Sequence, residues 1–123
     1  MKYIIIIAAL VVVAIIYFAF SGSKKLIDKS IQTYSGKISD YKGNKKLIVA
    51  FTASWASVWV ATSEEMKKID REKFDLLILD AEIDANEIKE YNVDFFPTVA
   101  FIENGKISNR VQNLMSIKQI DGW

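Results

Sequence analysis

The sequence predicts an α/β protein in which a mixed β-sheet is flanked by helices and preceded by one N-terminal transmembrane helix. Residues 3–20 form an uncharged, apolar run that is long enough to cross a bilayer. Two mostly apolar runs of strand length, 47–52 and 74–81, are separated by a segment of helix length, which is typical of parallel strands joined by a crossover. Two further strand-like segments meet at Asn104-Gly105, a strong hairpin signal.

The N-terminal run is predicted to be an uncleaved membrane anchor, so that residues 1–23 form the anchor and a short joint, and residues 24–123 a folded domain. Its eighteen residues make a helix of about 27 Å, close to the ~30 Å thickness of the hydrocarbon core. A cleaved signal peptide is the alternative, but its apolar region is typically about 7–15 residues long. Aromatic side chains stand near both ends of the run, where aromatic belts are expected: Tyr3, Tyr17, Phe18 and Phe20.

The first half of the domain is predicted from local patterns. Residues 25–34 place apolar side chains at near-helical spacing and predict a short amphipathic helix. The polar segment 36–46 has two glycines and predicts a loop. The run 47–52 predicts a strand that is buried on both faces. Residues 58–69 then predict a helix, with Met66 on its inner side.

The second half of the domain completes the alternation of strands and helices. Residues 74–81 predict a second buried strand. Residues 84–91 predict a short helix, because an aspartate stands at the N-cap position and a glutamate three residues later. The remaining predicted elements are a hairpin of strands at 98–103 and 106–111, and a final short helix at 116–123.

The composition excludes several classes of function. The net charge is +1, and no basic run is combined with aromatic residues, so we expect no nucleic-acid partner. The chain has no cysteine and no histidine, which excludes disulfides, thiol nucleophiles and the usual zinc sites. Asp80, Glu82 and Asp84 are acidic neighbours, but a strand end followed by a helix cap explains them better than a metal site. We expect no metal, no cofactor and no small-molecule substrate.

Several motifs stand in a recognisable order along the domain. The strand at 47–51 ends in an aromatic residue, a short loop follows, and the residues WASVW occupy 55–59. Phe96-Pro97-Thr98 precedes a predicted strand, and Asn104-Gly105 forms the hairpin turn after it. This order resembles the thioredoxin family, in which W-C-x-x-C begins a helix and a hydrophobic residue precedes a cis-proline. The resemblance spans roughly 47–111 and implies a thioredoxin-like fold, but it fades upstream, where the family's first strand is not evident.

The motif departs from the family at the positions that carry the chemistry. Ala56 and Trp59 stand where the family has its two cysteines, Ala50 stands where many members keep a buried acid, and Val58 replaces the proline of the motif. Disulfide exchange needs a thiolate nucleophile and a second thiol that resolves the mixed disulfide. Ser57 cannot replace them, because a hydroxyl without a nearby base is a poor nucleophile. The domain is therefore predicted to be redox-inactive and not an enzyme.

The resemblance also implies a surface that binds polypeptides. Exposed aromatic side chains are effective binding anchors, and we favour surface positions for Trp55 and Phe96 over the alternative that Phe95 and Phe96 belong to the core. For Trp59 we favour an inward position that fills the room left by a cysteine. The predicted partner-binding residues are Trp55, Ala56, Ser57, Phe96 and Pro97, with Gln112 at the margin.

The predicted function is protein–protein interaction or assembly by a redox-inactive, membrane-anchored domain. The expected partners are the lipid bilayer and one or more proteins. Two alternatives stay open: a permanent structural subunit of a large assembly, such as a viral capsid–membrane layer or a membrane complex, and a chaperone-like peptide binder. The side of the membrane also stays open. The lysines after the anchor favour the cytoplasm, whereas many single-anchor domains of the thioredoxin-like family are extracytoplasmic.

Overall fold

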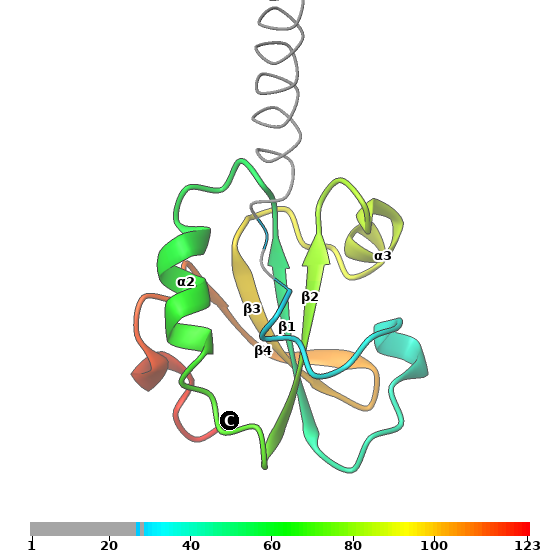
Figure 1. Ribbon diagram of the computed structural model, residues 1–123. Helices are drawn as coiled ribbons and strands as arrows, with labels where there is room; N and C mark the ends of the chain where they lie inside the picture. Colours follow the sequence, from blue (N-terminus) through cyan, green and yellow to red (C-terminus); the bar gives the residue numbers. More distant parts are fainter. Residues whose placement is uncertain (1–26, 28) are drawn as a thin grey trace, which may run out of the picture.

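The computed structural model describes residue 27 and residues 29–123, and the predicted anchor lies outside the described residues (Figure 1). Within the described part, no helix combines the length and the apolar character that a membrane span requires. The elements follow the order 3₁₀-helix η1 (Ile38–Asp40), β1 (Lys46–Thr52), α2 (Trp59–Met66), β2 (Phe74–Asp80), α3 (Ala85–Glu90), β3 (Thr98–Glu103), β4 (Lys106–Gln112) and 3₁₀-helix η2 (Ile117–Ile120).

The four strands form one mixed sheet in the order β2-β1-β3-β4. Strands β1 and β2 are parallel, whereas β3 is antiparallel to both β1 and β4. A bulge between Phe101 and Ile102 shifts the register of the hairpin. The turn at Asn104-Gly105 has positive φ at both residues, which explains the asparagine and glycine there. The predicted mixed sheet with a terminal hairpin is therefore confirmed.

Helices α2 and α3 cover opposite faces of the sheet, and each face has its own core (Figure 1). Side chains along β1 alternate between the two faces. Ile48 packs with Trp59 of α2, whereas Val49 and Phe51 pack with Ile88 of α3. Because both faces of β1 are covered, its sequence is almost continuously apolar.

The helix predicted at 25–34 is wrong in its described part. This segment lies along the outer edge of β2, where the Thr33 N–H donates to the carbonyl of Leu76 at 2.9 Å. Two backbone N–H groups on this edge of β2 donate to side chains instead of to a neighbouring strand. The Thr33 hydroxyl accepts the Leu76 N–H at 2.8 Å, and the Gln32 amide oxygen accepts the Ile78 N–H at 2.9 Å. The edge needs these partners, because backbone groups left unpaired are costly. The described part of this segment thus pairs with the edge of β2 without forming a strand, and no first strand of the family was evident from the sequence either.

Two predicted helices are shorter in the structure. Helix α2 ends at Met66, because the next residues close 3₁₀-type turns, as in the hydrogen bond from the Ile69 N–H to the Met66 carbonyl. The final helix is a single 3₁₀ turn. It starts at a capping box in which the Ser116 hydroxyl accepts a backbone N–H and the Gln119 side chain accepts the Ser116 N–H.

The acidic residues around α3 bind backbone N–H groups. Asp84 occupies the predicted N-cap position, but its carboxylate accepts the Asp80 N–H at 2.8 Å instead of a helix N–H. The Asp80 carboxylate accepts the Glu82 N–H. Glu87, predicted as the second member of a capping box, accepts the Ile38 N–H at 2.9 Å. Among the described residues, no group of three His, Cys, Asp or Glu side chains could hold a metal ion.

Tyr41 links stability to alkaline pH. Burial and the hydrogen bond that its hydroxyl donates to Asp75 raise its pKa from 10.0 to about 12. Between these two values the folded protein keeps a proton that the unfolded chain loses. The contribution of Tyr41 to the free energy of unfolding is therefore fully present below pH 10 and is lost as the pH rises toward 12. We expect Tyr41→Phe to make this alkaline decline shallower in urea unfolding measured across that range. An unchanged slope would show that other groups cause the decline.

Candidate functional site

The loop between β1 and α2 carries the degenerate motif. The Ala56 N–H donates to the Ala53 carbonyl at 3.0 Å, and the Trp59 N–H donates to the Ala56 carbonyl at 3.0 Å. These two turns leave Trp55 65% exposed and Ser57 exposed, while Ala56 packs partly against the core below α2. The loop therefore presents an indole and a hydroxyl to the surface. Residues 53–58 contain no titratable side chain.

The segment that precedes β3 adopts the geometry implied by the resemblance. The peptide bond between Phe96 and Pro97 is cis. Pro97 is buried, and its carbonyl accepts the Asn113 N–H at 3.0 Å. The Thr98 hydroxyl donates to the Phe95 carbonyl at 2.7 Å. Hydrogen bonds on both sides of the proline thus fix the backbone beside the loop of the degenerate motif.

The sheet brings these two segments together. Phe51 pairs with Thr98, so the end of β1 and the start of β3 are neighbours. The rings of Trp55 and Phe96 meet edge to face, with centroids 5.8 Å apart and planes at 87°. Such a pair contributes about 0.5–1.5 kcal/mol beyond the area it buries. Gln112 is exposed at the end of β4, opposite Thr98.

Trp59 occupies the position of the family's second cysteine and faces inward. It is 3% exposed and belongs to the core that also contains Ala50 and Leu114. The inward position predicted for Trp59 is therefore confirmed. Next to it on α2, the buried Thr62 hydroxyl donates to the Leu114 carbonyl at 2.9 Å and ties the helix to the segment after β4. The site therefore has a buried, packed base and an exposed Trp55. Phe96, which was predicted at the surface, is half-buried and packs against the core on the α3 face of the sheet.

Two exposed apolar residues in neighbouring loops were not among the predicted binding residues. Ile83, in the loop after β2, is 76% exposed, and Phe95 is 38% exposed. Phe95 therefore does not belong to the core, contrary to the alternative considered from the sequence. The sequence does contain an indication that Ile83 is exposed. Ile83 stands between Glu82 and Asp84 in a short polar turn, where no core position is expected.

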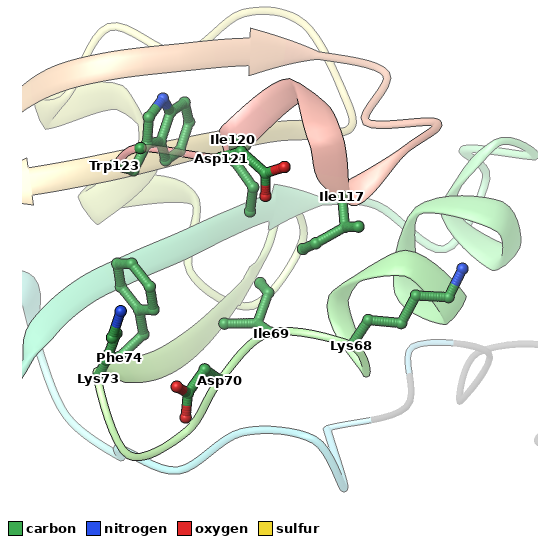
Figure 2. Close-up of a pocket in the computed structure, with 10 residues that line it drawn as sticks. Lys68, Ile69, Asp70, Lys73, Phe74, Ile117, Ile120, Asp121 and Trp123 are labelled. Atoms are coloured by element: carbon green, nitrogen blue, oxygen red, sulfur yellow. The ribbon is translucent and has the colours of Figure 1, made fainter.

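A separate cavity of about 300 Å³ lies beyond the other end of α2 (Figure 2). Ile69, Phe74 and Ile117 surround the hollow, whereas the amine of Lys68 points away from it. None of the residues predicted for partner binding lines this cavity. It therefore does not extend the site formed by Trp55 and Phe96.

Comparison with known proteins decides the family. The family model described as Thioredoxin matches residues 25–122. The chain belongs to the thioredoxin family. A thioredoxin of Mycoplasmoides gallisepticum is 32% identical over 69 residues, which cover 54% of this chain and 69% of that protein.

Solved thioredoxin structures agree with this fold. Desulfothioredoxin from Desulfovibrio vulgaris Hildenborough superposes with a TM-score of 0.59 at 19% identity, over 72% of this chain and 86% of that chain. Thioredoxin-2, a component of malaria parasite protein secretion machinery, has a TM-score of 0.59 at 20% identity, over 72% and 91% of the two chains. At these identities the two structures show that the fold is shared. Unlike a thioredoxin with the W-C-x-x-C motif, the chain has no cysteine.

Proposed function

We propose that this chain is a redox-inactive thioredoxin domain, anchored in a membrane by residues 3–20, that acts in protein–protein interaction or assembly through Trp55 and Phe96. One observation carries the proposal. At the motif that gives the family its chemistry, the second cysteine position is a buried tryptophan, while the exposed Trp55 contacts the half-buried Phe96 beside the cis-proline.

The loss of chemistry is supported by what the loop contains. The chain has no thiol, and residues 53–58 supply no acid or base that could activate Ser57. The position of the resolving cysteine is taken by Trp59, and replacing this buried indole with the smaller cysteine would leave a cavity in the core. Restoring the chemistry would therefore require more than one change at the loop.

The interaction role is supported by the exposure of Trp55. A tryptophan that is 65% exposed leaves much apolar area in water, and tryptophan is among the residues most often found at energetic centres of interfaces. Phe96 holds the indole from one side, so the ring loses little conformational freedom on binding. The fixed backbone around Pro97 adds a rigid support. These features fit an anchor that a partner protein covers.

The absence of redox chemistry predicts a simple biochemical result. The full-length protein, solubilised in detergent, is expected to give no reduction of insulin disulfides by dithiothreitol above the rate of the blank, because no thiol can form a mixed disulfide. A thioredoxin with an intact C-x-x-C motif serves as the positive control. Measurable turnover by the purified chain would contradict this part of the proposal.

Trp55→Ala is expected to weaken partner binding. Loss of an anchor residue typically costs at least about 2 kcal/mol, which corresponds to roughly 30-fold weaker affinity. The affinity of full-length protein for the partner isolated with it measures this effect. Met115→Ala is the matched control, because Met115 is also apolar and 57% exposed but lies after β4. Equal weakening by both changes would argue against a partner site at Trp55.

A further inference from the structure

Exposed apolar side chains gather at one end of the sheet. Strands β1 and β2 are parallel and end at this side, and β3 begins there, because it is antiparallel to β1. Figure 1 shows the loops after β1 and β2 and the segment before β3 at this common end. Of the five large hydrophobic residues that are exposed in the described part, four lie in these loops or in the first turn of α2: Trp55, Val60, Ile83 and Phe95.

The chain also enters the described domain at this end. The Lys29 amine lies 3.8 Å from the Asp84 carboxylate, and Asp84 follows Ile83 in the loop after β2. From there the chain runs down the edge of β2, where Gln32 contacts Ile78 and Thr33 contacts Leu76. The order of these contacts fixes the direction of the chain: the described segment 29–33 begins at the end that carries Ile83 and runs away from it.

The length of the connection limits where this end can lie relative to a bilayer. Eight residues separate Phe20, the last residue of the apolar run, from Lys29. Even when fully extended they span only about 30 Å. Strands of seven residues are about 23 Å long, so the opposite end of the sheet lies about that much farther from the point of entry. The end that carries Ile83 therefore lies within about 30 Å of the proposed anchor, and it is the end at which the chain leads to that anchor.

We propose that this end of the domain rests on the surface of the bilayer that holds the anchor, with Ile83 and Phe95 in contact with the lipid interface. The inference rests on the membrane anchor in the proposed function and adds an orientation to it. Apolar and aromatic side chains at the end of a membrane-tethered domain bury area at the headgroup–acyl boundary. A partner that covers Trp55 then approaches along the membrane surface.

The charges at this end select the kind of lipid. Glu82 and Asp94 are exposed and directly precede Ile83 and Phe95 in the sequence, while Lys29 at the same end is paired with Asp84. Carboxylates beside the contact oppose anionic headgroups, whereas a zwitterionic surface carries no net charge to repel them. The expected surface is therefore phosphatidylcholine-like, and contact is expected to decrease when anionic lipid is added.

The absence of cysteine makes this orientation measurable. Single variants Ile83→Cys and Phe95→Cys of the full-length protein are labelled with one fluorophore and placed in phosphatidylcholine nanodiscs, with or without lipid brominated near the headgroup end of its acyl chains. Glu72→Cys is the matched control, because Glu72 is exposed in the turn before β2, at the opposite end. The labels at 83 and 95 are expected to lose at least about half of their emission to the brominated lipid, and the label at 72 very little.

The outcomes separate the orientation from the anchor. If the protein floats with vesicles but the labels at 83 and 95 are no more quenched than the label at 72, the lipid contact is refuted and the anchor stands. Shielding of position 83 that occurs only in native membranes, and not in lipid nanodiscs, also refutes it and assigns this end to a protein. If the protein does not float with vesicles, the anchor and the orientation both fail.

Discussion

Trp59→Ala is expected to lower the free energy of unfolding by about 3–5 kcal/mol, the usual range when a large buried aromatic side chain is removed. The indole is 3% exposed, at the start of α2, and packs in the core with Ala50 and Leu114. Small neighbours such as Ala50 cannot expand into the space, so a cavity would stay. Urea unfolding of the full-length protein in detergent, followed by circular dichroism, measures the change.

Trp55→Ala is the matched control for this prediction, because it makes the same chemical change four positions earlier. Trp55 is 65% exposed and loses mainly its edge-to-face contact with Phe96, so we expect a loss of about 1 kcal/mol or less. A clear difference between the two variants separates the structural tryptophan from the one that is available to partners. Similar losses would mean that Trp59 does not fill the site as described.

Thr62→Val is expected to destabilise the protein by about 1–3 kcal/mol, although valine has nearly the same shape as threonine. The buried Thr62 hydroxyl donates to the Leu114 carbonyl at 2.9 Å. Valine has no hydroxyl, so the buried Leu114 carbonyl would lose its hydrogen-bond donor. The free-energy cost of burying that carbonyl away from water would then not be offset by a hydrogen bond. Urea unfolding at neutral pH measures the loss.

Thr52→Val is the matched control for the second prediction. Thr52 is fully buried at the end of β1, and its hydroxyl has no hydrogen-bond partner among the described residues. Replacement by valine removes a buried polar group that makes no hydrogen bond, so stability is expected to stay the same or to rise. Destabilisation by Thr52→Val equal to that by Thr62→Val would contradict the hydrogen-bond assignment.

The central part of the fold could be predicted from the sequence, because local signals and packing agree there. The continuous apolar run of β1 reflects a strand covered on both faces, and Asn104-Gly105 reflects a turn with positive φ at both residues. The N-terminal segment was not predictable in the same way. Gln32 and Thr33 stand at helix-compatible positions, but their side chains bind the open edge of β2, and this need arises only once the sheet exists.

The candidate site was predictable to a similar degree. Trp59 was placed inward and Trp55 outward from their positions in the degenerate motif, and the structure agrees. The contact between Trp55 and Phe96 depends on the pairing of β1 with β3, which brings together residues far apart in the sequence. Ile83 was missed, because a single apolar residue in a polar turn shows its significance only when neighbouring loops are placed beside it.

The proposed function depends on protein binding through Trp55 and Phe96 at a thioredoxin-family site without thiols. Its most direct test replaces Phe96 with the photo-reactive p-benzoylphenylalanine in the full-length protein and irradiates native membranes. Lys106, exposed at the start of β4, carries the same probe as a control. We predict protein adducts from position 96 that decrease with Trp55→Ala, and few from position 106. Adducts that form from position 106 but not from position 96 would contradict the claim.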